Sequence, residues 1–381
     1  MQRSLQTVIT RDLAKKMVFI TGPRQAGKTT LSEALIAAHD SIKGTSQYLN
    51  YDVLEDRSII TQQLWDARAP LLVLDEIHKM PQWKSWLKGV YDGKPKAQQL
   101  LVTGSARLDT FRQSGDSLAG RFYALRLHPI SVAEWCEQTG AKPEEALTHL
   151  LARGGFPEPC LANTPEEAER WRRQYFDGLV RNDVLEFSRL KEVATMRLFA
   201  QMLRSRVGSP LSLASMARDL RLSPTTLKTY LDILEALYIV FIVRPWHRNI
   251  ARATLQAPKV YFYDTGLVIG DNGLRYENLV ACALLKHVEY LQDTQGKEMG
   301  LHYIRTKDNA EVDFCISEGD TLTDLIECKL TDAKPHRALV RFAAEWPNAR
   351  ATQLVRDLRQ PRMHGALRVV AAAPWLAQLA A

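Results

Sequence analysis

The stretch that decides the fold lies near the start of the chain, where an apolar run leads into a glycine-rich loop. It reads Met17-Val18-Phe19-Ile20-Thr21-Gly22-Pro23-Arg24-Gln25-Ala26-Gly27-Lys28-Thr29-Thr30. The loop fits the pattern G-x-x-x-x-G-K-[ST], and residues 30–38 read as a helix. The glycines let backbone N–H groups turn inward around phosphate oxygens, and the start of the helix adds partial positive charge. This order of strand, loop and helix predicts a nucleotide-binding P-loop.

The loop residues have distinct expected roles in holding ATP. The residues expected to surround the phosphates are Gly22, Pro23, Arg24, Gln25, Ala26, Gly27, Lys28, Thr29 and Thr30. Lys28 is expected to reach the β- and γ-phosphates and to act in catalysis, and the Thr29 hydroxyl is expected to bind Mg²⁺. ATP and Mg²⁺ are therefore the expected cofactors.

A second apolar run, residues 71–74 (Leu-Leu-Val-Leu), ends in two acids, Asp75 and Glu76. Four consecutive apolar residues are typical of a strand buried on both faces of a parallel sheet. A P-loop needs an acid at the end of such a strand to support its Mg²⁺, and Asp75 has that place. Glu76 is expected to orient and deprotonate the attacking water as the catalytic base.

Two further positions have more than one interpretation. Residues 99–103 predict a third strand, expected between the other two, which runs into Gly104 and Ser105. Thr103 or Ser105 could sense the γ-phosphate or position the water in catalysis, and either could be a turn residue. Arg121 follows a small-residue turn. It is either an arginine that completes charge stabilisation of the transferring phosphoryl group, in its own or a neighbouring subunit, or a surface cation.

Seven stretches together resemble a known family. They are GPRQAGKT (22–29), LLVLDEIHK (71–79), LLVTGSA (100–106), SLAGRF (117–122), LHPISVAEW (127–135), GGFPEP (154–159) and RNDVLEF (181–187). In this order they look like a large bacterial and archaeal family of AAA+-type P-loop ATPases that carry a nuclease-like C-terminal domain of the PD-(D/E)XK type and mostly lack an assigned function. The resemblance covers nearly the whole chain. It implies ATP hydrolysis and a homo-oligomer, which could be a ring.

The middle of the chain carries a helix-turn-helix pattern. A helical stretch at 212–220 is followed by Ser223 as the expected N-cap, Pro224 at the first helical position and a helix over 225–234. Apolar runs at 237–243 and 259–263 predict the β-hairpin of a winged helix. Residues 201–250 hold seven basic and three acidic side chains. The pattern predicts either contact with the DNA backbone, without sequence-specific base readout, or a packing module.

The last third of the chain carries an acidic pattern. A helix over 278–287 has Glu277 on its expected first turn, and strands are expected at 301–305, 310–316 and 323–330. Asp313 lies in the second strand, and Glu327 and Lys329 share one face of the third because strand side chains alternate. This layout matches PD-(D/E)XK nucleases. There, residues placed like Asp313 and Glu327 hold Mg²⁺ or Mn²⁺, with Glu277 assisting and Lys329 orienting the water. The same fold without cleavage is the alternative.

Composition sets the wider limits. The chain has 381 residues, a formal net charge of +7 and five scattered cysteines without a Cys-x-x-Cys pair. Its longest apolar run is far shorter than a membrane-spanning helix, which needs about 20 residues. We expect a cytoplasmic protein with no membrane anchor, disulfide framework or zinc site. The mild positive charge permits nucleic acid as a partner.

The expected fold is α/β and has three parts. They are a P-loop NTPase (AAA+-like) parallel sheet domain over residues 1–150, a helical region with a winged helix over 151–260, and an α/β restriction-endonuclease-like domain over 261–381. The expected function is hydrolysis of ATP to ADP and phosphate with Mg²⁺, coupled to DNA binding or remodelling. The alternatives are a slow ATP-dependent switch that recruits a protein partner and an ATP-regulated, metal-dependent DNA nuclease.

Overall fold

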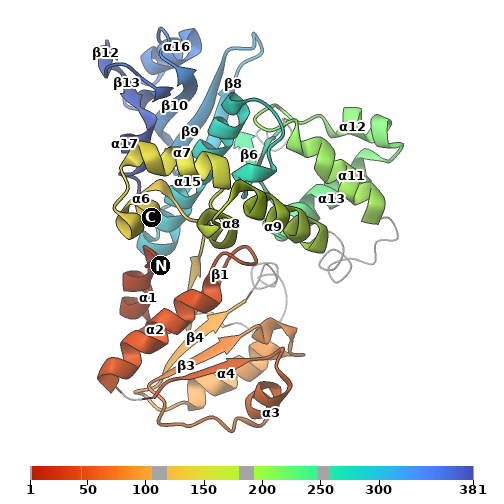
Figure 1. The fold of residues 1–381 in the computed structure, drawn as a ribbon, viewed down its shortest axis with the longest axis vertical. Coiled ribbons are helices and arrows are strands. Elements are labelled where there is room, and N and C mark those ends of the chain that lie inside the picture. Colours follow the sequence, from red (N-terminus) through yellow and green to blue (C-terminus); the bar gives the residue numbers. More distant parts are fainter. Residues whose placement is uncertain (1, 44, 105–117, 180–192, 248–256, 381) are drawn as a thin grey trace. The chain divides into compact units, whose positions relative to one another are not determined.

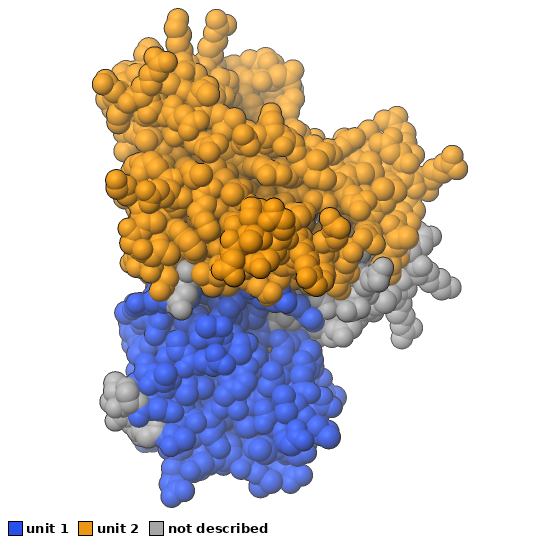
Figure 2. All heavy atoms as spheres, in the orientation of Figure 1, with its two compact units in different colours: residues 1–128 blue, residues 129–381 orange. Residues whose placement is uncertain are grey.

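The computed structural model describes residues 2–43, 45–104, 118–179, 193–247 and 257–380. The chain forms two compact units, residues 1–128 and residues 129–381, which Figure 2 draws in different colours. The strands form two sheets, one of five strands and one of eight. Within the described ranges, no helix has both the length and the apolar character needed to cross a membrane.

The first unit is built on a five-stranded sheet (Figure 1). Its strands are β1 (Met17–Thr21), β2 (Gln47–Asn50), β3 (Leu71–Asp75), β4 (Gln99–Thr103) and β5 (Phe122–Arg126). They lie in the order β2-β3-β4-β1-β5, and every neighbouring pair is parallel. The third predicted strand thus lies between the other two, as expected. Because all five strands are parallel, their carboxyl ends meet at one edge, which is where ligands bind in sheets of this kind.

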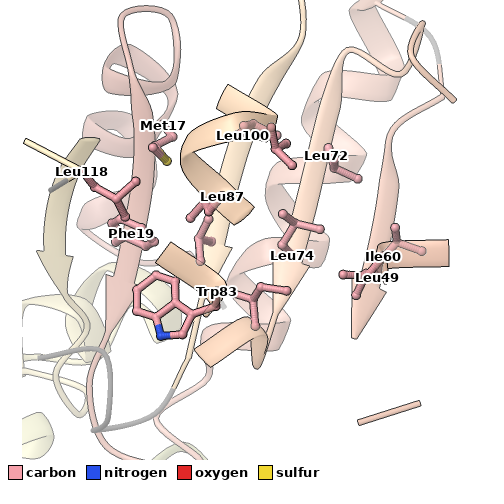
Figure 3. Close-up of a cluster of buried hydrophobic side chains, with 13 residues drawn as sticks. Met17, Phe19, Leu49, Ile60, Leu72, Leu74, Trp83, Leu87, Leu100 and Leu118 are labelled. Atoms are coloured by element: carbon pink, nitrogen blue, oxygen red, sulfur yellow. The ribbon is translucent and has the colours of Figure 1, made fainter. Parts of the chain in front are cut away.

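Packing on both faces explains why β1 and β3 are apolar along their length. α4 (Trp83–Gly93) and α3 (Leu54–Gln62) contribute Trp83, Leu87 and Ile60 to a buried cluster with strand residues such as Phe19 and Leu74 (Figure 3). The alternate strand residues are buried as well, and α1 (Leu5–Leu13) and α2 (Lys28–Lys43) contact β1, β3 and β4. A parallel sheet covered on two faces needs such continuous apolar strands.

The second unit begins with helices. They are α6 (Val132–Thr139), α7 (Pro143–Arg153), α8 (Pro157–Leu161), α9 (Pro165–Gly178), α11 (Val193–Arg204), α12 (Leu213–Leu220) and α13 (Pro224–Ala236). The predicted N-cap at Ser223 is confirmed, since its side chain accepts the Thr226 N–H and Pro224 is the first helical residue. Ser212 caps α12 in the same way by accepting the Ser215 N–H. These caps supply acceptors for N–H groups that the first helical turn leaves without a partner.

The second unit also contains an eight-stranded mixed sheet. Its strands are β6 (Val240–Pro245), β7 (Lys259–Phe262), β8 (Met299–Arg305), β9 (Glu311–Glu318), β10 (Thr321–Thr331), β11 (Arg350–Asp357), β12 (Arg362–His364) and β13 (Leu367–Ala371). Their order is β12-β13-β11-β10-β9-β8-β6-β7. The elements α15 (Asn272–Gln295), β8, β9, β10, α16 (Arg337–Glu345) and β11 follow one another along the chain, and α17 (Ala372–Leu376) comes last. β8, β9 and β10 pair antiparallel, whereas β10 and β11 pair parallel.

The observed boundaries differ from the expected domains in three places. α6 and α7, expected within residues 1–150, belong to the second unit, where Lys286 Nζ on α15 donates to Glu134 Oε2 on α6 at 2.5 Å. β6 pairs antiparallel with β7 on one side and parallel with β8 on the other. The expected regions 151–260 and 261–381 therefore contribute strands to the same sheet. α15 begins at Asn272, with Asp271 as its N-cap, so Glu277 lies in the second turn of the helix.

Candidate functional site

The P-loop has the backbone shape that phosphate binding requires. Gly22, Gln25 and Gly27 have φ of 139°, 58° and 96°, so the loop repeatedly reverses its backbone direction between β1 and α2. A Cβ on Gly22 would lie 2.3 Å from the carbonyl oxygen of Leu127, so no larger residue fits there without a backbone shift. Reversals of this kind turn successive N–H groups toward one anion. The predicted strand, loop and helix are confirmed.

Lys28 is the first residue of α2, and its side chain folds back over the loop. Its Nζ donates to the carbonyl oxygens of Gly22 at 3.1 Å and Pro23 at 2.7 Å. Burial lowers the pKa of Lys28 to about 8, although Glu76 and Asp75 oppose this effect. The Lys28 ammonium therefore lies over the loop in a site with little solvent. A bound triphosphate would supply the negative charge that stabilises this ammonium.

Arg3 supports the loop from the N-terminal segment, a role that the sequence pattern did not reveal. It is buried, and its guanidinium donates to the carbonyl oxygens of Ala26 at 2.9 Å and His128 at 2.5 Å. These bonds tie the P-loop to the segment that follows β5. The remaining loop residues, Arg24, Thr29 and Thr30, are partly or fully exposed at the same edge of the sheet.

Asp75 ends β3, which is separated from the P-loop strand β1 by β4, and it is held by two hydroxyl groups. Thr103, at the end of the neighbouring β4, donates to Asp75 Oδ1, and Tyr48 on β2 donates to Asp75 Oδ2. Tyr48 also interacts with Thr29, so its hydroxyl lies between the two predicted Mg²⁺ ligands. Burial and the Asp75 carboxylate raise the pKa of Tyr48, which keeps the hydroxyl protonated as a donor. The sequence reasoning did not identify Tyr48, which lies on a short, mostly polar edge strand.

These oxygen donors fit Mg²⁺. Thr29 and Asp75 supply a hydroxyl and a carboxylate, and Mg²⁺ in nucleotide sites binds few protein oxygens while its other positions are filled by phosphates and water. Tyr48 and Thr103 would orient Asp75 from behind, as second-layer hydrogen bonds do around metal ligands.

Glu76 follows directly and has the left-handed backbone conformation, with φ of 55°. This conformation costs energy for a non-glycine residue and is found at functional positions. Its Oε2 is buried without a hydrogen-bond partner and lies 3.5 Å from both Lys79 Nζ and His78 Nε2. Burial raises the pKa of Glu76 above its ordinary value, against the opposing charge of Lys79. A carboxylate whose oxygen accepts no hydrogen bond and whose pKa is raised is suited to accept a proton from water.

The structure places Arg121 away from these residues. It precedes β5, and its backbone oxygen accepts the N–H of Met17, the first residue of β1. Since β1 and β5 are parallel, Arg121 lies at the edge of the sheet opposite the P-loop. Its guanidinium forms two bonds to Asp92, at 2.9 and 3.0 Å. A role for Arg121 at the nucleotide site of its own subunit therefore does not fit. Ser105 and the RNDVLEF stretch lie outside the described residues.

The predicted C-terminal residues do come together. Asp313 on β9 accepts the N–H of Cys328 on β10 at 2.9 Å, and Glu327 on β10 is bonded by Lys329 Nζ at 2.7 Å. Glu277 on α15 accepts the Tyr261 hydroxyl at 2.8 Å. Burial raises the pKa of Glu277 and Asp313. The sequence reasoning missed Lys259 on β7, whose Nζ lies 3.7 Å from Glu277 and 3.9 Å from Asp313.

This C-terminal cluster does not have the arrangement of a metal site. Across the described residues, no group of three or more His, Cys, Asp or Glu side chains is placed to hold a metal ion. Burial disfavours the charge of Lys259, but the surrounding Glu277, Asp313 and Glu311 raise its pKa above the ordinary value. The carboxylates of Glu277 and Asp313 therefore face a protein cation at the place where the sequence predicts a second metal site with Glu327.

In the helix-turn-helix region, α12 and α13 are followed by the β6–β7 hairpin, in the predicted order. The basic side chains Arg218, Arg221, Lys228 and Arg244 are exposed. Arg204 is partly buried, and its Nε donates to the carbonyl oxygen of Leu267 at 2.6 Å, so it has a structural partner. Arg248 lies outside the described residues.

Comparison with protein families gives three matches along the chain. Residues 14–136 match an AAA domain, residues 144–276 match a domain of unknown function (DUF8612), and residues 272–373 match a second domain of unknown function (DUF4143). The AAA match covers the P-loop and the acids that end β3.

Curated relatives include an uncharacterized protein of Mycobacterium tuberculosis, 31% identical over 253 residues, which are 66% of this chain and 55% of the relative. An uncharacterized protein of Methanocaldococcus jannaschii is 24% identical over 347 residues, covering 81% of this chain and 75% of that protein. The chain thus spans about half the length of the mycobacterial relative that it matches.

Solved structures that align with the chain include AMPPCP-bound DnaA from Aquifex aeolicus, with 17% identity and a TM-score of 0.33 over 61% of this chain and 86% of DnaA. The RuvB branch migration motor of Thermotoga maritima aligns with 18% identity and a TM-score of 0.31, over 63% of this chain and 89% of RuvB. The AAA match, together with the observed P-loop, parallel sheet and terminal acids, shows that this chain contains an AAA-type P-loop ATPase domain.

Proposed function

We propose that the protein hydrolyses ATP to ADP and phosphate in its first unit. The observation that carries this proposal is the convergence of three groups at the carboxyl edge of one parallel sheet. They are the Lys28 ammonium over the P-loop, the Asp75 carboxylate held by Tyr48 and Thr103, and the Glu76 carboxylate, one oxygen of which accepts no hydrogen bond.

The chain's own residues account for most of the chemistry. The inward-turned N–H groups of the loop bind the phosphates, and Lys28 stabilises the charge that develops on the transferring phosphoryl group. Glu76 orients the attacking water and accepts its proton. Mg²⁺, when bound by Thr29 and Asp75, neutralises the phosphate oxygens.

Two substitutions test these roles by phosphate release and nucleotide binding. Lys28→Ala is expected to abolish turnover and weaken ATP binding, whereas Glu76→Gln is expected to bind ATP and hydrolyse it at least ~100-fold more slowly. Lys96→Ala, at an exposed lysine of the first unit, serves as a matched control for loss of a lysine. Undiminished hydrolysis in Glu76→Gln would reject the assignment of the base.

We propose further that ATP turnover is coupled to DNA through backbone contacts on α12 and α13. The exposed Arg218, Arg221 and Lys228 support this, because cations on one helical pair are suited to phosphates without base readout. Duplex, forked and four-way-junction DNA are expected to stimulate phosphate release, and the Arg218/Arg221/Lys228→Ala variant is expected to lose the stimulation. Arg170/Arg173→Ala, exposed on α9, is the control. No stimulation by any DNA would favour the slow nucleotide switch instead.

Two roles stay open for Arg121: a surface cation paired with Asp92, and an arginine that completes the site of a neighbouring subunit in a homo-oligomer. We propose the second. Its position at the far edge of its own sheet supports this choice. Mixing Arg121→Ala protein with Lys28→Ala protein is expected to restore part of the hydrolysis that each lacks, because one mixed interface contains both intact residues. Activity that only falls in proportion to the mutant fraction would reject the proposal.

A further inference from the structure

Lys259 lies at the centre of the acidic cluster in the second unit. It is the first residue of β7, and only 1% of it is exposed. Its Nζ lies 2.7 Å from Glu311 Oε1, 3.7 Å from Glu277 Oε1 and 3.9 Å from Asp313 Oδ1. These acids come from two elements that are separated along the chain: Glu277 lies on α15, and Glu311 and Asp313 lie on β9. They converge on one point, and that point is an ammonium group.

Protein groups also donate to other carboxylate oxygens of the cluster. Glu277 Oε1 accepts the Tyr261 hydroxyl, and Asp313 Oδ2 accepts the N–H of Cys328. Glu327 Oε1 lies 2.7 Å from Lys329 Nζ and 3.1 Å from His336 Nδ1. Hydrogen bonds of this kind orient a carboxylate and are compatible with metal binding, as at Asp75, so the feature that sets this cluster apart is the ammonium inside it.

The backbone closes the cluster on one side. Gly208 has φ of 71°, and a Cβ there would lie 2.5 Å from Glu277 Oε1. Glu277 is thus enclosed between the Gly208 backbone, Tyr261 and Lys259. The ammonium and these protein groups thus lie against Glu277, while 17% of the Glu277 side chain and 18% of the Asp313 side chain stay exposed. A divalent cation among Glu277 and Asp313 would also be repelled by the neighbouring ammonium.

We propose that the Lys259 ammonium takes the place of the divalent cation in this acidic site, so that the C-terminal part of the chain holds its carboxylates together without metal and does not cleave DNA by metal-assisted hydrolysis. Lys259 then ties the β6–β7 hairpin to α15 and β9. In this arrangement Glu327 and Lys329 form an ion pair with each other. Glu327 then does not act as a metal ligand, and Lys329 does not orient a water molecule.

The proposal predicts that removing one protein cation creates a metal site. In nucleotide-free full-length protein, Mn²⁺ binding is followed by loss of the free-ion EPR signal. Lys259→Ala is expected to bind Mn²⁺ at least ~10-fold more tightly than the unaltered protein, because Glu277 and Asp313 then lose their cation, whereas Glu311 keeps Arg305 at 3.2 Å. Adding Asp313→Asn to Lys259→Ala should abolish the gain. Lys297→Ala removes a lysine that is paired with Glu318 at the surface, and it should gain nothing.

Two outcomes would overturn the proposal. One is a folded Lys259→Ala protein, as judged by circular dichroism, that binds Mn²⁺ no better than the unaltered chain. The other needs no Lys259 variant: Mn²⁺-dependent cleavage of DNA by the unaltered protein that is lost in Asp313→Asn. If Lys259→Ala does not fold, the unaltered protein still decides the question, since the absence of cleavage and of Asp313-dependent Mn²⁺ binding is the result expected.

Discussion

Raising the pH from 7 to 9 should weaken ATP binding about tenfold, because the P-loop lysine loses its proton in the nucleotide-free protein. Burial lowers the pKa of Lys28 to about 8, whereas a bound triphosphate would return it to its ordinary range or above. Below pH 8 the free protein already carries the ammonium, and ATP binds to it directly. Above pH 8 each binding event must also take a proton from solution.

The magnitude follows from the two protonation states. At pH 9, about one free molecule in eleven holds the Lys28 proton, against about ten in eleven at pH 7. The apparent affinity falls in the same ratio, which corresponds to about 1.4 kcal/mol. At pH 8 the free site is half protonated, so ATP binding should take up about 0.5 proton per site.

Isothermal titration calorimetry measures both quantities. Titrations with MgATP at pH 7, 8 and 9, each in two buffers of different ionisation enthalpy, give the affinity and the proton uptake together. The phosphate groups of ATP contribute little to the slope, because their last ionisation lies near pH 6. Lys28→Arg keeps its charge throughout this range, so its affinity should not change with pH.

An affinity that stays constant from pH 7 to 9, with no proton uptake at pH 8, would refute the reasoning. A slope that persists in Lys28→Arg would show that a different group titrates.

Three further substitutions have expected outcomes. Tyr48→Phe removes the hydroxyl between Thr29 and Asp75, so the Mg²⁺ concentration for half-maximal hydrolysis should rise about tenfold, as measured by phosphate release over a Mg²⁺ series. Gly22→Ala brings a Cβ within 2.3 Å of the Leu127 carbonyl, so ATP binding should be lost and unfolding free energy should fall by about 2 kcal/mol or more in denaturant titrations. Gly154→Ala places a Cβ 2.2 Å from Asp264 Oδ1 and should break the buried ion pair between Asp264 and Arg172. The free energy of unfolding should then fall by about 3 kcal/mol in the same assay. Gly89→Ala, where a Cβ meets nothing within 4 Å, is the control for both glycine variants, and equal losses in it would contradict the steric argument.

The P-loop and its strands could be predicted because their signal is local. Each of β1, β3 and β4 is a short apolar run, and the residue that follows it carries the chemistry. The parallel arrangement then brings Lys28, Asp75 and Thr103 to one edge without any further information. Tyr48 could not be predicted in the same way. It lies on the edge strand β2, whose four-residue sequence is too short to show a strand pattern and whose pairing with β3 depends on residues 25 positions away.

Arg121 illustrates a different limit. A small-residue turn before an arginine indicates that the arginine side chain is accessible to a ligand. It does not indicate at which edge of the sheet the side chain lies. The pairing of β5 with β1 decides this, and it places Arg121 next to the start of β1. Likewise the expected boundary at residue 150 followed the length of an average domain. The buried Lys286–Glu134 pair and the Ile130–Gly155 hydrogen bond assign α6 and α7 to the second unit instead.

The acidic cluster shows that acidic residues at the right spacing are weak evidence for a metal site. The charged groups that lie beside them in the fold are stronger evidence. Glu277, Asp313, Glu327 and Lys329 all have the predicted types, and the strands bring them together as the alternation rule requires. Their chemistry nevertheless depends on which cation stands among them. That cation comes from β7, a strand that the sequence assigned to a different domain, and the pairing of β6 with β8 brings it to the cluster. In the P-loop the buried lysine faces backbone carbonyls and can exchange them for phosphate; in the cluster it faces fixed carboxylates that already neutralise it. The same residue type therefore marks a ligand site in the first unit and an internal ion pair in the second.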